Sequence, residues 1–201
     1  MRLVDTRDSY IEKLTQIIDD LTRHSFVAKT QSAYMNVLKE RLISETEILM
    51  QGDFVDNFSF VVQDEIQSLH WENSQATLHP FVAYYRHNDG TLENLNIMII
   101  SDSKVHNSVS VHAFLEAALD LVKNKFPTVK KVHYFTDGCG GQYKNRYNFI
   151  NLSPHQSDFG LQAKWNFFAT SHGKSACDGL GGTVKRLVTK QAFRDLHMTK
   201  F

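Results

Sequence analysis

The sequence has little cysteine and proline and no long apolar run. Two cysteines, Cys139 and Cys177, cannot form a disulfide framework, so we expect a reducing, intracellular compartment. No apolar segment approaches the roughly 20 residues of a membrane-spanning helix, and the first residues lack the apolar core of a signal peptide. A membrane protein and a secreted disulfide scaffold are therefore not expected.

The net charge is also zero, because 22 Lys and Arg balance 22 Asp and Glu. Residues 1–122 carry 9 basic and 18 acidic side chains, a net charge of −9, whereas residues 123–201 carry 13 basic and 4 acidic, a net charge of +9. A basic half suits an acidic polymer as partner. Interleaving of the two halves on folding would cancel this field, and the sequence leaves both outcomes open.

Aromatic residues are numerous, with 14 Phe, 7 Tyr and 2 Trp, which favours a packed core over disorder. Residues 9–49 carry apolar side chains at helical spacing with no proline, and we assign residues 1–47 to a helical N-terminal extension. Packing of these helices on the main domain is favoured over a dimerisation helix pair. Residues 48–201 are assigned to one further domain.

Strand and helix patterns alternate in residues 48–201. Strands are predicted in a first region that includes 58–62, in a hairpin over 80–100 that turns at Asp89-Gly90, and over 131–136 and 161–170. Helices are predicted over 111–126, 147–152 and 183–196. This order predicts an α/β fold with a five-stranded mixed sheet flanked by helices, as in the ribonuclease H-like fold.

Aspartates stand at the ends of several predicted strands. Asp53 lies in the first strand region, Asp137 ends the strand 131–136, and Asp178 begins the segment after the strand 161–170. Carboxylates that converge from separate elements are ligands that Mg²⁺ or Mn²⁺ prefers, and a two-metal site of this kind performs phosphoryl transfer. A turn residue or a helix cap is the alternative for each aspartate taken alone.

Other residues compete for the same roles. Asp56 competes with Asp53, but positions three apart on an extended strand face opposite sides, so only one can be a ligand and we choose Asp53. Asp195 competes with Asp178 and is expected to be solvated on a late helix.

Cys139 and Cys177 each lie within two residues of a candidate aspartate. With His133 and His172 they could form a zinc site, although the sequence has no close Cys-x-x-Cys or His-x-x-x-His pair there. Two small buried thiols that pack under the site are the favoured interpretation.

Eight of the ten glycines fall between residues 138 and 182, around the two later aspartates. Their spacing matches neither a P-loop nor a dinucleotide fingerprint, so a nucleotide cofactor is not indicated. His172 is a candidate catalytic residue that contacts the scissile phosphate or orders a metal-bound water, or else it caps its own loop. Basic residues expected to contact a nucleic-acid backbone are Lys144, Arg146, Lys174, Lys185 and Arg186.

Four segments carry a resemblance to a known group: Asp53–Phe58, Gln63–Trp71, Thr136–Asn145 and Ser171–Gly182. They resemble proteins encoded by mobile DNA elements in animal genomes, which are similar to cut-and-paste transposases of the acidic-triad type. The resemblance covers roughly residues 45–195. Two departures are visible. Such enzymes usually carry an N-terminal DNA-binding domain, often a zinc finger, and none is seen in this sequence; the last acidic position is aspartate where many such enzymes have glutamate.

The resemblance implies that Asp53, Asp137 and Asp178 are the catalytic, metal-binding triad, with Mg²⁺ or Mn²⁺ as cofactor. It implies DNA as partner, a nuclear location, and metal-dependent strand cleavage and strand transfer, with a homo-oligomer as an open possibility. Two alternatives stand beside it. One is a nuclease of the same fold with no transfer step, and the other is a catalytically silent DNA- or chromatin-binding protein.

Overall fold

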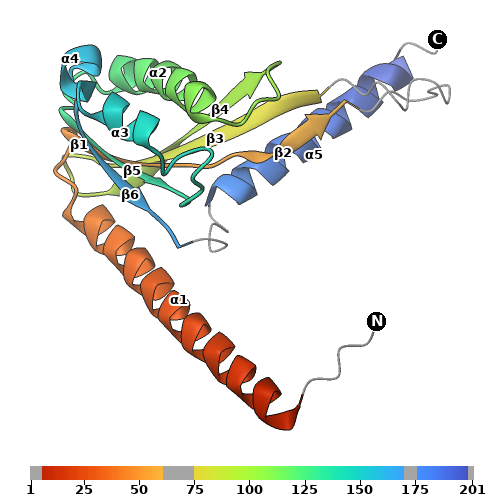
Figure 1. Ribbon diagram of the computed structural model, residues 1–201. Coiled ribbons are helices and arrows are strands. Elements are labelled where there is room, and N and C mark those ends of the chain that lie inside the picture. The colour runs from red at the N-terminus through yellow and green to blue at the C-terminus, as the bar shows by residue number, and fades with distance from the viewer. Residues whose placement is uncertain (1–5, 61–74, 170–175, 199–201) are drawn as a thin grey trace.

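The computed structural model describes residues 6–60, 75–169 and 176–198. No helix in these ranges is long and apolar enough to cross a membrane. The elements are α1 (Arg7–Arg41), β1 (Glu47–Gly52), β2 (Val55–Ser59), β3 (Gln75–Arg86), β4 (Leu92–Ser101), α2 (Ser108–Lys125), β5 (Lys131–Thr136), α3 (Arg146–Leu152), α4 (His155–Phe159), β6 (Gln162–Phe167) and α5 (Ala176–Met198). Figure 1 shows their arrangement.

The strands form one mixed sheet that is flanked by helices, which is the α/β architecture predicted from the sequence (Figure 1). β3 pairs antiparallel with β4 and with β1, and β5 lies parallel between β1 and β6. The predicted sheet had five strands, whereas the structure has six. The difference arises because β1 and β2 follow one another along the same edge of β3, with a break at Asp53 and Phe54. The first strand region is therefore one sheet position occupied by two short strands.

The main core lies between the sheet and α2. Alternate residues of β1 point to this side, among them Ile48 and Met50, and they pack in one cluster with Tyr134 of β5 and Leu119 of α2. Two-residue periodicity in the strands and helical periodicity in α2 together create this layer. Asn107 starts α2 earlier than predicted, because its side-chain oxygen accepts hydrogen bonds from the backbone N–H groups at the helix start.

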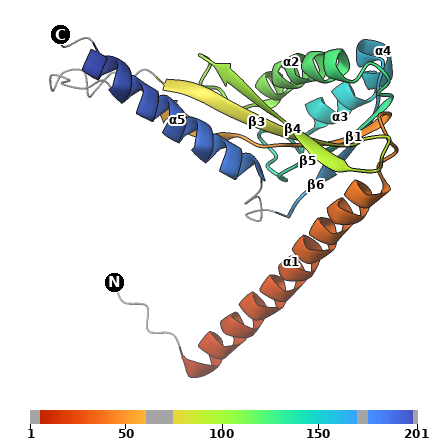
Figure 2. The same cartoon turned by 180° about the vertical axis from the view of Figure 1, so that it is seen from behind.

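The opposite face of the sheet is covered by two helices. Leu49 and Phe135 pack against Met35 and Leu42 at the end of α1, and α5 packs along β3, β2 and β1. Figure 2 shows α5 on the side of the sheet away from α2. Only the last residues of α1 join this layer, while the rest of the helix points away from the sheet (Figures 1 and 2).

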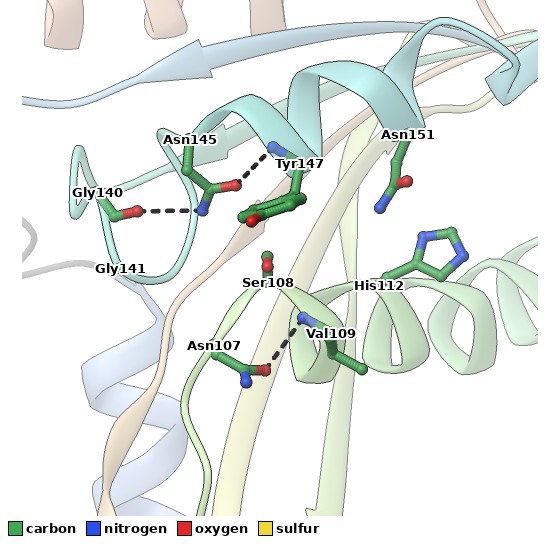
Figure 3. A pocket seen from close by; sticks show the side chains of 9 residues that line it. All are labelled: Asn107, Ser108, Val109, His112, Gly140, Gly141, Asn145, Tyr147 and Asn151. Carbon is green, nitrogen blue, oxygen red and sulfur yellow. Dashed lines mark hydrogen bonds between the residues drawn. The ribbon is translucent and has the colours of Figure 1, made fainter.

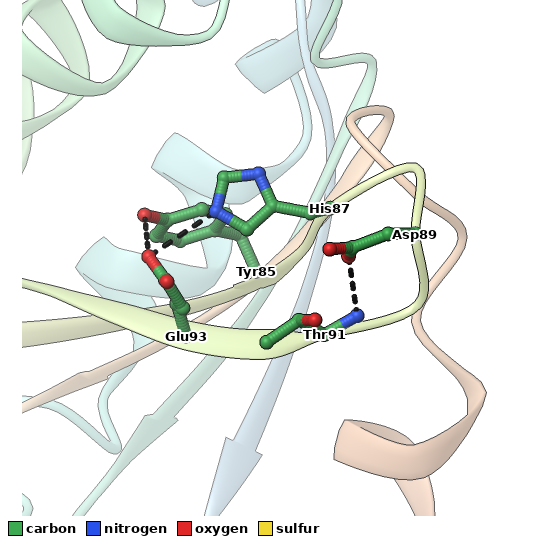
Figure 4. A network of polar contacts seen from close by, with 5 residues as sticks. All are labelled: Tyr85, His87, Asp89, Thr91 and Glu93. Atoms are coloured by element: carbon green, nitrogen blue, oxygen red, sulfur yellow. Dashed lines mark hydrogen bonds and ion pairs between the residues drawn. The ribbon is translucent and has the colours of Figure 1, made fainter.

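The predicted turn at Asp89-Gly90 is confirmed, with Gly90 at φ 87°. Asp89 accepts a hydrogen bond of 2.8 Å from the Thr91 backbone N–H, and Glu93 accepts one of 2.9 Å from the Tyr85 hydroxyl across the hairpin (Figure 4). The strands that it joins are longer than the predicted 80–100 hairpin, because they extend to residues 75 and 101.

Two helix predictions were wrong in their bounds. Residues 9–49 were expected to be helical, but α1 ends at Arg41 and β1 begins at Glu47. The last helix was expected to begin at Thr183, but α5 begins at Ala176, so Asp178 lies in its first turn. α4 was not predicted at all, whereas α3 matches the predicted short helix to within one residue.

Candidate active site at the carboxyl edge of the sheet

Parallel pairing brings Asp53 and Asp137 to the same edge of the sheet. In the register between β1 and β5, Gln51 lies opposite Phe135. Asp53 and Asp137 each follow two residues later, as the two neighbouring strands end. Convergence at the carboxyl ends of parallel strands was the basis of the sequence prediction, and the register places these two aspartates in corresponding positions.

Asp178 lies in the first turn of α5, which packs on β3, β2 and β1. The thiol of the preceding residue, Cys177, is fully buried and donates to the backbone oxygens of Gln51, at 3.5 Å, and Pro80, at 3.7 Å. These contacts hold the start of α5 against the end of β1. Gly181, one turn further, packs so closely on β2 that an added Cβ would lie 2.6 Å from Val55 Cγ1.

The three carboxylates interact electrostatically. Burial raises the pKa of Asp53 to about 7, and the negative charges of Asp137 and Asp178 contribute to the same shift. Burial also raises the pKa of Asp137, while the hydrogen bond from the Cys139 backbone N–H, at 3.1 Å, acts in the opposite direction. Carboxylates crowded in this way favour either a proton or a cation.

The donor chemistry of this group suits a hard divalent cation. Among the residues that the structure describes, however, no three or more His, Cys, Asp or Glu side chains form a cluster that could hold a metal ion. The electrostatic interaction of the aspartates is compatible with the lack of such a cluster. Repulsion between charges acts over about 10 Å at 0.1 M salt, whereas a Mg²⁺–oxygen bond is about 2.1 Å long. The aspartates are thus near neighbours without forming a ready ligand set.

A buried tyrosine–histidine pair lies behind the aspartates. The Tyr143 hydroxyl is 2.8 Å from His79 Nε2, and both side chains are almost completely buried. Burial raises the pKa of Tyr143, and the nearby charges of Asp53 and Asp137 raise it further. Burial lowers the pKa of His79 to about 3, so this imidazole is neutral.

An aromatic group surrounds this pair. The ring of Phe54, the residue after Asp53, meets the rings of His79 edge-on at 4.5 Å and His106 in a stack at 4.3 Å. Phe54 also contacts Tyr143, with ring centroids 5.8 Å apart. The break between β1 and β2 therefore sits on a rigid aromatic support, which fixes the backbone that carries Asp53.

The loop after Asp137 is held by its own hydrogen bonds. The Cys139 carbonyl accepts from the backbone N–H of Tyr143 at 2.9 Å, and the buried Asn148 side chain donates to the Gln142 and Tyr143 carbonyls at 2.7 and 2.9 Å. Asn145 donates to the Gly140 carbonyl at 3.1 Å. This bonding orients Tyr143 toward the aspartates.

A cavity of about 640 Å³ adjoins this loop, between the start of α2 and α3 (Figure 3). The ring of Tyr147 faces it in Figure 3, and Asn107 and Asn145 cap the two helices beside it. Its lining residues are Asn107, Ser108, Val109, His112, Gly140, Gly141, Asn145, Tyr147 and Asn151. Its size falls within the range of small-molecule sites.

Four of the five predicted nucleic-acid contacts lie in the described part of the chain. Two of them follow Asp137 closely in the sequence, and the other two belong to α5. Lys144 and Arg146 are exposed in the loop and at the start of α3, where the Arg146 guanidinium donates to the Tyr147 hydroxyl at 2.8 Å. Lys185 is half-buried and Arg186 exposed on α5. The fifth, Lys174, and the candidate catalytic residue His172 lie outside the described residues.

Asp56 and Asp195 competed for the predicted metal-binding roles, and a zinc site was the alternative for the cysteines and histidines. Asp56 lies in β2, whereas Asp53 follows the end of β1, so the argument about alternation along a single strand was wrong. The side chains of Asp56 and Asp195 lie outside the described part of the chain. For the zinc alternative, His133 lies within β5, where its Nε2 is 4.0 Å from Glu47. Of the two thiols, Cys177 is buried as expected, whereas Cys139 is only half-buried.

Sequence reasoning missed His79, Tyr143 and Phe54. His79 and Tyr143 are 64 residues apart and meet only in the folded chain. The sequence did contain one indication of the buried position of His79. Residues 79, 81 and 83 alternate along one strand and so face the same side of the sheet, and Phe81 and Ala83 belong to the core. A histidine at such a position predicts a buried hydrogen-bond partner.

The comparisons with known proteins concern family and fold. A family model described as "Domain of unknown function (DUF8701)" matches residues 31–200. No curated protein matches the chain. Among solved structures, the chain is similar to LC9-RNase H1, a type 1 RNase H with the type 2 active-site motif, at 12% identity and a TM-score of 0.43, over 70% of this chain and 71% of that one.

Proposed function

The chain belongs to this family of domains of unknown function, and we propose that it is a metal-dependent enzyme that cleaves phosphodiester bonds in nucleic acid. One observation carries the proposal: Asp53 and Asp137 end neighbouring parallel strands in the same register, and Asp178 is close enough to contribute to the raised pKa of Asp53. Asp53 and Asp137 are partly buried and Asp178 is exposed. Carboxylates that repel one another disfavour the folded state, so a bound cation offers a physical reason for their convergence.

In this proposal Asp53, Asp137 and Asp178 hold one or two Mg²⁺ or Mn²⁺ ions. When bound, such ions supply an activated water and stabilise the charge on the leaving oxygen. The chain's own residues prepare the site. Cys177 anchors the start of α5, which carries Asp178, against the end of β1, and the Tyr143–His79 pair fills the volume behind the strand ends.

The raised pKa of Asp53 adds a pH dependence to the proposal. In the metal-free protein near pH 7, the Asp53 carboxyl is protonated in roughly half of the molecules. That proton must leave before the carboxylate can bind a cation. Cation affinity should therefore fall as the pH drops below about 7.

The finer parts of the proposal are DNA as the substrate, strand transfer after cleavage, and action in the nucleus. They rest on the resemblance of the glycine-flanked aspartate segments to acidic-triad transposases. Lys144, Arg146 and Arg186 are the exposed cations proposed to contact the phosphate backbone, with Lys185 beside them. His172 and Lys174 remain proposed participants.

The test is cleavage of labelled DNA duplex, single-stranded DNA and an RNA–DNA hybrid with Mg²⁺ or Mn²⁺. Asp137→Asn should abolish cleavage. Asp158→Asn is the matched control, because Asp158 is an exposed aspartate on α4, just before β6 and so at the opposite edge of the sheet. The control should retain full activity.

Failure of the folded wild-type protein to cleave any of the three substrates with either metal would contradict the proposal. Metal-independent binding without cleavage would favour the silent DNA-binding alternative instead. Joining of a labelled 3′ end to target DNA would distinguish a transposase from a nuclease. Cleavage without joining would reduce the function to hydrolysis.

A further inference from the structure

α1 is far longer than its contact with the domain requires. It has 35 residues, which corresponds to about 52 Å of helix. Its end packs on the sheet through Met35 and Leu42, whereas its first half projects away from the sheet (Figures 1 and 2). An isolated helix is marginal in water, so a projecting helix needs a partner for its apolar side chains.

A single stripe, apolar except at His24 and Gln31, runs along the helix. It recurs at alternating spacings of four and three residues, the repeat of a coiled coil. Its members are Tyr10, Leu14, Ile17, Leu21, His24, Ala28, Gln31, Met35, Leu38 and Leu42. At the end of α1 this stripe is buried on the domain. Further back the same stripe is exposed, by 62% at Tyr10, 43% at Leu14, 62% at Ile17 and 63% at Leu21.

We propose that two copies of this chain associate through antiparallel pairing of their α1 helices. In this arrangement Tyr10 packs against Leu21 of the partner subunit, and Leu14 packs against Ile17 of the partner subunit. Each contact occurs twice because the pair is two-fold symmetric. The exposed stripe is then buried by the same repeat that packs the end of α1 on its own domain.

The residues that flank the stripe select the antiparallel orientation. On one flank, Lys13 lies beside the partner's Asp20, so two opposite-charge pairs form. On the other flank, Ile11 lies beside the partner's Ile18, and these side chains are 48% and 52% exposed in one chain. A parallel pair would instead set Lys13 beside the partner's Ile18, with no charge pairing.

In this register residues 7–24 of the two helices lie side by side. Antiparallel pairing also keeps the two domains at opposite ends of the helix pair.

The first test is the mass of the full chain in solution, by light scattering and sedimentation at about 50 μM, a concentration well above the micromolar Kd that a modest helix interface gives. We expect twice the 23.1 kDa of one chain. Leu14→Lys with Leu21→Lys should give a monomer with unchanged thermal unfolding of the domain. The matched control, Thr22→Lys with Thr30→Lys, adds two lysines at exposed positions away from the stripe and should stay dimeric. A monomeric wild type, or loss of the dimer in the control, would overturn the proposal.

The second test addresses orientation. Lys13→Glu and Asp20→Lys should each raise the dimer dissociation constant about tenfold, because each creates two like-charge contacts. The double variant should restore it. Positions 13 and 20 are about 10 Å apart along one helix, so restoration cannot come from a contact within a chain. If the double variant is as weak as the two single changes combined, the antiparallel pairing is wrong.

Discussion

Replacing Asp53 by Asn should stabilise the metal-free protein. The pKa of Asp53 is about 7 in the folded chain, against an ordinary value of 3.8. A carboxyl whose folded pKa is raised is penalised in its charged form, so the penalty is complete above pH 7 and disappears as the pH falls below 3.8. The gap of about three pKa units corresponds to an upper limit of about 4 kcal/mol at pH 8. Asn removes the charge and keeps the shape.

The assay is urea unfolding in EDTA, for wild type and Asp53→Asn, at pH 8, 5 and 4. The free energy of unfolding of the variant should exceed that of the wild type by up to about 4 kcal/mol at pH 8, about 2 at pH 5, and less than about 1 at pH 4. Asp158→Asn, at an exposed position, should have little effect at any of these pH values. A variant that is no more stable than wild type at pH 8, or a gain that does not change with pH, would refute the electrostatic reasoning.

Three further predictions concern the surroundings of the aspartates. Mn²⁺ should raise the thermal midpoint of wild type and leave that of Asp53→Asn unchanged, as checked by calorimetry with and without EDTA. Tyr143→Phe should lower the free energy of unfolding by about 1–3 kcal/mol, because it leaves the buried His79 Nε2 unpaired; urea unfolding of the two proteins measures this. Gly181→Ala should cost about 1–3 kcal/mol through overlap with Val55, and Val55→Ala in the same chain should recover most of the loss.

The last helix begins earlier in the chain than its sequence predicted. The last helix was predicted to begin at Thr183, after Gly179, Gly181 and Gly182, and glycine disfavours the interior of a helix. In the structure α5 begins at Ala176 and includes all three. At Gly181 the reason is tertiary, because any side chain there would overlap Val55 of β2. Close packing of helix on sheet outweighs the local propensity.

The break at Asp53 has a similar origin. The residues from 48 to 57 mix apolar and acidic side chains, and their pattern does not reveal where a strand stops. The interruption between Gly52 and Val55 depends on pairing with β3 and on the aromatic support of Phe54 by His79 and His106. Those partners are 23 residues or more away in the chain, so no local pattern contains them.

Features that depend on near neighbours in the chain could be predicted from the amino-acid sequence. These are the periodicity of strands and helices, the Asp89-Gly90 turn, and the delivery of Asp137 at the end of a buried strand. Tertiary structure decided which strands are neighbours, that Asp178 approaches on a helix, and that burial beside two other charges raises the pKa of Asp53 to about 7. The physical reason is that backbone preferences act over a few residues, whereas burial and charge repulsion depend on segments that only the completed fold brings together.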